Sequence, residues 1–350
     1  MSQLHLINPT DLQNFVTKIL IANGTSSTHA DIVSKCLVSA DLRGVDTHGS
    51  NRIPSYMERI RQKALDASAI PTIEQKTPVA AQVNGHNGFG FVAAHMAMER
   101  AIEMAQTFGM GMVSVKHSNH FGMSAWLVKQ ALEAGMMSLF ACATSLGRAG
   151  EIDGGFTDCM WGSEWGRNEA VYFGYGAFHR GSREDLQGVE EGEKIPDDWA
   201  LDKDGNRTDD PAKALEGVML PMGGPKGSAL SIMMDVFSGV FSGAAFAGHV
   251  TNPYDPSKPA DVGHFIVAIK PDLFMSMEEF QGRMDYLYKR VVESERMAGV
   301  ERIYFPGELE IITEEKRLVE GIPFAEAEIA SLNKEADLVG VEHLKVQTSI

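Results

Sequence analysis

The chain has 350 residues, a length that suits two or three sub-domains rather than one small core. Its 47 acidic and 31 basic side chains give a formal charge of -16, which would repel a phosphate backbone and argues against a nucleic-acid partner. Three scattered cysteines without a CxxC pair, no apolar leader and no apolar run of membrane-spanning length predict a reduced, cytoplasmic protein without a membrane partner.

The first expected elements are two amphipathic helices, over Asp11 to Ile21 and Thr28 to Leu42, where apolar residues recur at helical spacing. Glycines then break the pattern in a run that holds His48 and Arg52. Arg52 can hold a substrate carboxylate by two parallel hydrogen bonds, and His48 can exchange a proton with the hydroxyl on the adjacent carbon. The alternative is a solvated loop before a helix from Pro54 to Lys63.

A glycine-rich turn follows the next expected strand, Val79 to Val83. The run Gly88-Phe-Gly90-Phe-Val-Ala93 fits the relaxed dinucleotide fingerprint G-x-G-x-x-A and leads into an expected helix from Phe91 to Thr107. That fingerprint also requires an acidic residue at the end of the following strand, and this strand ends in Lys116. We therefore interpret the glycines as a turn that lets a helix pack close to a sheet.

The best catalytic candidate in the sequence is the loop that holds His117 and His120. It lies between an expected buried strand, Met110 to Val115, and an expected helix, Gly122 to Ala134. Backbone N–H groups at a helix start are unpaired, so an anionic substrate group can dock there beside a histidine. One alternative is that the histidines cap the turn. Another is a zinc hydrolase, but no third ligand stands at a suitable spacing, and we predict no metal site.

The regular pattern stops after an apolar strand expected at Met136 to Ala143. From Leu146 to about Gly188 the chain is rich in glycine, has no proline and no lysine, and shows neither helical nor strand periodicity. Farther on, Asp202 to Asn206 imitates the start of a calcium loop. Its glycine comes too early and Lys213 stands where a bidentate glutamate is needed, so we expect a polar turn.

A second glycine-rich run, Gly223-Gly224-Pro225-Lys226-Gly227-Ser228, precedes an apolar helix expected from Ala229 to about Val240. A lysine and closely approaching backbone at a helix start can seat phosphates, although the order differs from a Walker loop and a structural turn is the alternative. A strand at His264 to Ile269 and a helix from Met277 to about Glu295 follow. Two charged helical segments, Thr313 to Glu320 and Phe324 to Leu338, end the chain.

Five stretches, in this order and spacing, resemble the malate/L-lactate dehydrogenase family, which is unrelated to the Rossmann-type lactate dehydrogenases. They are Asp46-Thr47-His48-Gly49 with Arg52, Asn119-His120-Phe121-Gly122, Ile195 to Pro211, Gly223 to Gly227, and Tyr304-Phe305-Pro306-Gly307. The resemblance implies an α/β (α+β) fold with a mixed, largely antiparallel nucleotide-binding sheet of non-Rossmann type, flanked by helices. It also implies NAD or NADP as cofactor and a homodimer with the active site near the subunit interface.

The same resemblance assigns roles to single residues. His120 matches the family's proton acceptor, and His48 and Arg52 match its substrate-binding pair. The positions that match cofactor contacts are Thr144, Lys226 and Gly227. The reaction implied is hydride transfer between a nicotinamide ring and C2 of a small 2-hydroxy or 2-keto acid, with a histidine taking the hydroxyl proton.

The expected organisation has two parts. Residues 1–75 form a helical substrate-binding region that packs with C-terminal helices in 276–350, and residues 76–275 form the cofactor-binding sheet domain, with 146–190 as an atypical segment. The resemblance vanishes between Ser145 and Glu190, although the flanks keep nearly the family spacing. A shifted reading frame would produce this pattern. The rival interpretation is true divergence, which would make the chain a non-catalytic dimeric relative that has lost cofactor binding.

Overall fold

The fold is built around one mixed sheet. The computed structural model describes residues 4–142, 159–164, 170–175, 194–221 and 223–349. The seven strands follow the order β2-β3-β4-β11-β5-β6-β7, and only β3 and β4 pair in parallel. Their bounds are β2 Thr72–Thr77, β3 Ala80–Asn84, β4 Met110–Ser118, β5 Met137–Cys142, β6 Cys159–Glu164, β7 Ala170–Tyr175 and β11 Val262–Ile269. The predicted mixed, largely antiparallel sheet is confirmed.

Helix α4 (Gly90–Phe108) connects the parallel pair β3 and β4 and packs on the sheet through a run of buried alanines and methionines. The close packing depends on Gly90. A Cβ at this position would lie 2.0 Å from the backbone oxygen of Asn119, so only glycine allows α4 to start beside the end of β4. The structure thus confirms that the glycines of the 88–93 run serve packing.

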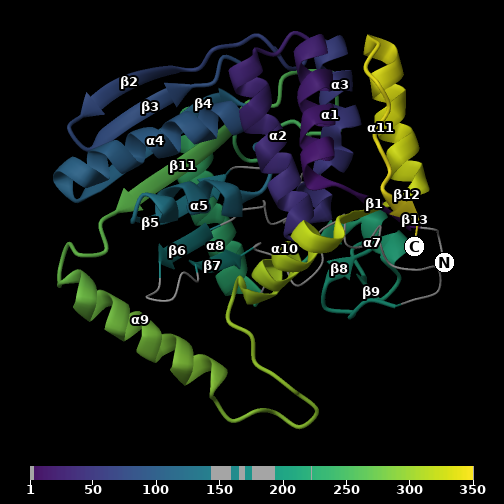
Figure 1. The fold of residues 1–350 in the computed structure, drawn as a ribbon. Helices are drawn as coiled ribbons and strands as arrows, with labels where there is room; N and C mark the ends of the chain where they lie inside the picture. The colour runs from purple at the N-terminus through teal and green to yellow at the C-terminus, as the bar shows by residue number, and fades with distance from the viewer. Residues whose placement is uncertain (1–3, 143–158, 165–169, 176–193, 222, 350) are drawn as a thin grey trace.

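Helix α5 (Ser124–Glu133) follows β4 and lies beside α4 on the same side of the sheet (Figure 1). Beyond the sheet, α8 (Pro225–Asp235) continues into the short π-helix η3 (Val236–Val240), which packs on β11. The small sheet β10-β8-β9 lies apart from the main one (Figure 1). Its strands are β8 Ala200–Leu201, β9 Arg207–Thr208 and β10 Val218–Met219, and α7 (Pro211–Glu216) joins the last two.

A second hydrophobic core lies beside the sheet and is made by helices from both ends of the chain. Leu12, Ile19, Leu37 and Ile53 meet Leu332 there, and all five side chains are fully buried. The helices are α1 Pro9–Ala22, α2 Ser27–Leu42, α3 Ile53–Arg61 and α11 Glu326–Val339. A three-stranded sheet, β12-β1-β13, closes this part of the chain, with β1 Leu4–Ile7, β12 Ile322–Ala325 and β13 Thr348–Ser349.

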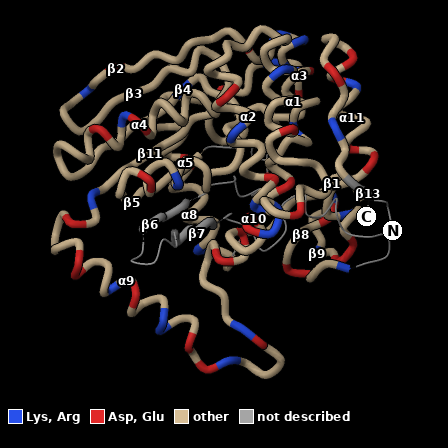
Figure 2. The backbone as a smooth tube through the Cα atoms, in the orientation of Figure 1, with Lys and Arg blue, Asp and Glu red and all other residues tan. Residues whose placement is uncertain are grey.

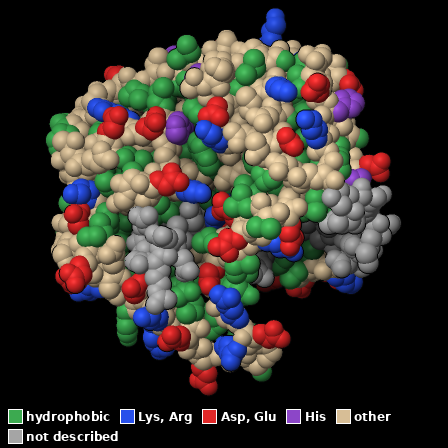
Figure 3. All heavy atoms as spheres, viewed as in Figure 1, with side chains coloured by type: hydrophobic (Ala, Val, Ile, Leu, Met, Phe, Trp, Pro, Cys, Tyr) green, Lys and Arg blue, Asp and Glu red, His purple; other side chains and the backbone are tan. Residues whose placement is uncertain are grey.

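An arm made of α9 (Met277–Val292) and the segment 293–307 extends from the body (Figure 1). All residues of α9 are described, and none of them is buried. Lysine, arginine and acidic residues alternate along it (Figure 2), and charges of both signs are mixed over the visible surface (Figure 3). The chain then returns through α10 (Glu308–Glu320). No helix within the described residues combines the length and apolarity that crossing a bilayer requires.

Several element predictions need correction. Strand β4 runs to Ser118 rather than Val115, so His117 lies inside the strand and not on the loop after it. The helix after the second glycine run starts at Pro225, which places Lys226 in its first turn. Phe324 belongs to strand β12, because the chain turns at Gly321 before the last helix begins.

Three further predictions concern the calcium-like run, the 146–190 segment and the division into domains. Asp202 accepts hydrogen bonds from the backbone N–H groups of Asp204 and Asn206, which confirms the polar turn at the calcium-like run. Most of the 146–190 segment lies outside the described residues, which there comprise the backbones of β6 and β7. The division of the chain into 1–75 with 276–350 and 76–275 stays a prediction.

Candidate active site

His120 lies on the loop between β4 and α5, and its neighbour Asn119 holds that loop in place. The amide nitrogen of buried Asn119 donates to the backbone oxygens of Asn87, at 3.1 Å, and Gly88, at 2.9 Å. Arg59 of α3 lies within hydrogen-bond reach of the Asn119 side-chain oxygen, at 3.4 Å. The loop is therefore fixed by the β3–α4 turn on one side and by α3 on the other, which positions the His120 ring.

The His120 imidazole has two neighbours at Nδ1. The Tyr56 hydroxyl oxygen lies 2.8 Å away, and the Gly122 backbone N–H donates at 3.2 Å. The His48 ring stacks on the His120 ring, with 5.4 Å between the two ring centroids. His48, Tyr56 and His120 thus meet, although they belong to different segments of the chain.

Burial keeps both partners of this pair uncharged near neutral pH. The pKa of His120 lies well below the ordinary value of 6.5, first because burial disfavours the imidazolium and then because the Arg52 guanidinium lies nearby. Burial likewise raises the pKa of the Tyr56 phenol. A neutral imidazole beside a neutral hydroxyl can accept a proton, which is what a general base requires.

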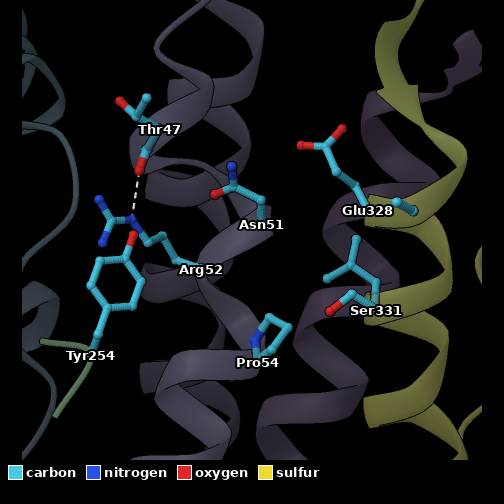
Figure 4. Close-up of a pocket in the computed structure, with 9 residues that line it drawn as sticks. Thr47, Asn51, Arg52, Pro54, Tyr254, Glu328 and Ser331 are labelled. Atoms are coloured by element: carbon cyan, nitrogen blue, oxygen red, sulfur yellow. Dashed lines mark hydrogen bonds between the residues drawn. The ribbon is translucent and has the colours of Figure 1, made fainter. Parts of the chain in front are cut away.

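Arg52 is almost fully buried at the start of α3. Its Nε donates to the backbone oxygen of Thr47 at 2.5 Å, and its guanidinium carbon lies 4.7 Å from the centroid of the Tyr254 ring. Figure 4 shows this arrangement, with Tyr254 beside the guanidinium. Backbone, ring and helix together hold the cation in one orientation, as recognition of a planar carboxylate requires.

A cavity of about 360 Å³ opens beside Arg52. Asn51 and Pro54 line one wall, and Glu328 and Ser331 of α11 face them across the space (Figure 4). The remaining lining residues are Thr47, Tyr254, Ala327 and Leu332. The cavity shows that the region next to the guanidinium is accessible to a small molecule.

His117 does not join this group, contrary to the prediction that placed both histidines in one site. Its Nδ1 lies 2.9 Å from a carboxylate oxygen of Asp261, and its side chain is about half exposed. Ser118 next to it is fully buried and contacts His264 Nε2 at 2.9 Å. Both contacts tie the end of β4 to β11. Within the described part of the chain, no three His, Cys, Asp or Glu side chains gather as a metal site would require.

The second glycine run has features typical of a phosphate-binding site. Gly223 and Gly224 have positive φ angles of 64° and 65°, and within the described residues no atom comes within 4 Å of a Cβ built at either position. Lys226 is exposed in the first turn of α8, and Gly227 is buried behind it. The residues present therefore fit a pyrophosphate-bearing cofactor, which would meet open backbone, a helix N-terminus and a cation. Thr144 lies outside the described residues.

Sequence reasoning missed the two tyrosines of this site. Tyr56 stands four residues after Arg52, which puts both on one side of the chain at helical spacing, and this spacing was the available signal. Tyr254 lies in an irregular loop, and no local pattern predicts that it reaches Arg52. His48, Arg52 and His120 were identified from the sequence, and the structure brings them together.

Comparison with known proteins decides the family. The sequence model of malate/L-lactate dehydrogenase matches residues 7–150 and 179–333 of the chain. The chain belongs to this family. The match omits residues 151–178, which lie within the interval from Ser145 to Glu190 where the resemblance was found to vanish.

Individual relatives of the family cover nearly the whole chain. Malate/(S)-sulfolactate dehydrogenase of Methanothermus fervidus is 34% identical over 343 residues, which cover 96% of this chain and 99% of the relative. Ureidoglycolate dehydrogenase (NAD(+)) of Escherichia coli is 31% identical over 322 residues, 90% of this chain and 91% of the relative. Sulfolactate dehydrogenase from Methanocaldococcus jannaschii has a similar solved structure, with a TM-score of 0.89 at 28% identity, covering 96% and 98% of the two chains. These relatives and the family model mark the chain as an oxidoreductase of the dehydrogenase type.

Proposed function

We propose that this family member is an NAD(P)-dependent oxidoreductase that transfers a hydride between nicotinamide and C2 of a small 2-hydroxy or 2-keto acid. The observation that carries the proposal is the meeting of His120, His48 and Tyr56 beside a fixed Arg52. A 2-hydroxy acid offers a carboxylate and a neighbouring hydroxyl, and the site offers a cation and a neutral imidazole for these two groups.

Arg52 holds the substrate carboxylate in this proposal, and His48 lies beside it as a second polar contact. The guanidinium is preorganised by Thr47 and Tyr254, so little side-chain freedom is lost when the substrate binds. Orientation of the carboxylate fixes C2 and its hydroxyl with respect to His120. Arg52 therefore acts on binding and alignment rather than on proton transfer.

His120 takes the hydroxyl proton during oxidation and returns it during reduction. The Tyr56 hydroxyl beside Nδ1 can accept from Nδ1–H or donate to a bare Nδ1, so it supports both neutral tautomers. With Nδ1–H donated to Tyr56, Nε2 is the nitrogen available to take a proton. The imidazolium formed in this way returns its Nε2 proton to the keto oxygen during reduction. The Gly122 N–H favours the other neutral tautomer, with Nδ1 bare, so oxidation requires the proton to be on Nδ1 instead.

The cofactor supplies the hydride acceptor or donor when it is bound. Lys226 and the first-turn amides of α8, including that of Gly227, are the groups we assign to its phosphates. We further propose that Thr144 contributes to the same cofactor site and that the active form is a homodimer. Sedimentation of the purified protein tests the dimer, since a monomer at working concentration would contradict it.

A substrate panel tests the proposed reaction. Malate, lactate, sulfolactate and ureidoglycolate are each offered with NAD and with NADP, and reduction of the nicotinamide is followed by its absorbance. We expect turnover of at least one acid with one of the two cofactors. Absence of turnover with all eight combinations, and with the corresponding keto acids and reduced cofactors, would refute the proposal.

The second candidate function is a dimeric relative without catalysis that has lost cofactor binding. The observation in its favour is the stretch 151–178, which the family model leaves unmatched. Titration with NADH or NADPH, followed by nicotinamide fluorescence, separates the two candidates. An enzyme gives a saturable signal, whereas the second candidate predicts none.

A further inference from the structure

The segment Asp46–Arg52, here called the substrate loop, contains both His48 and Arg52 and consists of two short 3-10 helices. Such short elements have few hydrogen bonds of their own, so their position depends on what surrounds them. The backbone N–H groups of His48, Gly49 and Arg52 are each hydrogen-bonded to an oxygen only three residues earlier. Contacts to other elements must therefore set where the loop lies.

The inner side of the substrate loop is held by Asp41 of α2. One carboxylate oxygen of Asp41 accepts from the Ser50 backbone N–H at 2.9 Å and from the Ser50 hydroxyl at 2.6 Å. Both residues are buried. This contact fixes the end of the loop next to Arg52, and it leaves the beginning of the loop to be held from elsewhere.

The outer side is held by Arg317 of α10, which is 271 residues away in sequence. Its two terminal nitrogens contact the two carboxylate oxygens of Asp46, at 2.5 and 3.1 Å, and Nη1 also donates to the backbone oxygen of Asp41. The Arg317 side chain is only 15% exposed. A fork of two parallel hydrogen bonds from a mostly buried guanidinium fixes orientation as well as distance.

Helix α10 approaches the substrate loop with one face. Thr313 and Glu314 lie on the same face as Arg317; Thr313 packs near Gly44, and Glu314 pairs with Arg43 at 3.0 Å. Every residue of α10 is described, and none is buried. Polar contacts with the end of α2 and the substrate loop therefore account for a large part of what holds this helix on the body.

We propose that Arg317 is a positioning residue for the dehydrogenase reaction. Its guanidinium fixes the beginning of the substrate loop through Asp46, and so sets how His48 and Arg52 face the carboxylate of the 2-hydroxy acid. The proposal rests on the function proposed above. It assigns α10, which contributes no residue to the group around His120, a part in substrate binding.

Kinetics of matched variants give the first test. Arg317→Ala is compared with Lys316→Ala, which removes the neighbouring cation on the exposed face of the same helix. We expect Arg317→Ala to lower kcat/KM for the acid about 10- to 100-fold, mainly through KM. The reason is that a displaced substrate loop no longer aligns the acid's carboxylate. KM for the cofactor and the rate with Lys316→Ala should stay near the wild-type values. Arg317→Lys keeps one contact to Asp46 and should recover part of the loss.

A double-variant cycle links the effect to Asp46. If Arg317 acts through Asp46, the pair Arg317→Ala with Asp46→Ala should have about the same KM for the acid as either single variant. A KM effect in the pair equal to the product of the two single effects would overturn the proposal. So would a loss confined to thermal stability and to the fraction of active protein, with KM unchanged, because that is the result of a merely structural anchor.

Hydrogen exchange gives a readout that does not depend on catalysis. We expect Arg317→Ala, but not Lys316→Ala, to speed exchange of the amides of residues 46–52 while amides of α1 and of the main sheet keep their protection. Unchanged exchange in the substrate loop would overturn the proposal even in an active enzyme. A wild-type protein without turnover on any acid would instead refute the proposed function, and the exchange result would still decide whether Arg317 orders the loop.

Discussion

His120 and Arg52 have different tasks in the proposed site, so their replacements should differ in kinetics. His120→Ala removes the proton acceptor and should lower kcat by about 10²- to 10⁴-fold. Arg52→Ala removes the carboxylate clamp and should mainly raise KM for the acid. Steady-state rates at saturating cofactor measure both, with His117→Ala as the control because that side chain pairs with Asp261 away from the group. Near-normal kcat in His120→Ala, with activity abolished in His48→Ala, would exchange the roles of the two histidines.

The pH dependence of the oxidation should reflect the low pKa of His120. Protonation in the free enzyme removes the base, so kcat/KM falls as the pH drops through this pKa. Because burial and the nearby Arg52 guanidinium keep the pKa well below 6.5, we expect the rate to be flat around neutral pH and to fall only under clearly acidic conditions. A pH profile of kcat/KM for the acid measures this. A midpoint at or above 6.5 would contradict the assignment.

Asp41 should make the folded chain less stable as the pH rises. Burial raises the pKa of its carboxyl group from 3.8 to about 8, although the hydrogen bonds from Ser50 oppose the shift. A raised folded-state pKa contributes stability that is complete below the unfolded value and is lost as the pH rises through the folded value, here between about 4 and 8.

Asp41→Asn should therefore flatten the fall of the melting temperature over this pH range, since an amide cannot ionise. Thermal unfolding of both proteins from pH 5 to 9 tests this, with the half-exposed Asp31→Asn on the same helix as the control. An equal loss of stability in Asp41→Asn at every pH would mean that the carboxyl is already ionised in the folded chain.

At the scale of elements, strong periodicity made β4, α4, α5 and α9 predictable to within a few residues. Strand β2 was missed because all of its side chains are exposed, so no apolar alternation marks it. The second half of strand β12 was assigned to the last helix because its four residues are too few to display a period. Local sequence patterns also limited what could be predicted of the candidate site. Polar residues close together in the sequence were found, whereas Tyr254 was missed because its contact with the site joins segments far apart in the chain.

The turn between the two 3-10 helices depends on a glycine that packs against α2. A Cβ at Gly49 would lie 1.6 Å from a carboxylate oxygen of Asp41, so Gly49→Ala must displace the substrate loop or the carboxylate. We expect a loss of about 1–3 kcal/mol in the free energy of unfolding and a raised KM for the acid. Denaturant unfolding measures the first. Gly282→Ala in α9, where the added carbon has open space, is the control and should be neutral or slightly stabilising.

For the whole molecule, the interval that the family model leaves unmatched raises a question about the natural polypeptide. The flanks keep the family's order, and the relative from Methanothermus fervidus aligns with 96% of the chain. If a shifted reading frame produced the interval, tryptic peptides between Ala149 and Arg180 should be missing from the natural protein. Peptide mass spectrometry tests this expectation. Clear detection of these peptides together with dehydrogenase activity would establish the interval as true divergence.

The contact between Arg317 and Asp46 also bears on how the protein is made. A ribosome has already synthesised His48, Arg52 and His120 when most of the C-terminal part, including α10 and α11, is still to come. The helices α1 and α2 and the β3-α4-β4 unit contain mainly local contacts and can form on this nascent chain. The substrate loop acquires its outer contact only after Arg317 has left the exit tunnel. A nascent chain therefore carries the histidine and arginine proposed for the reaction for a long time before the arrangement that would use them is complete.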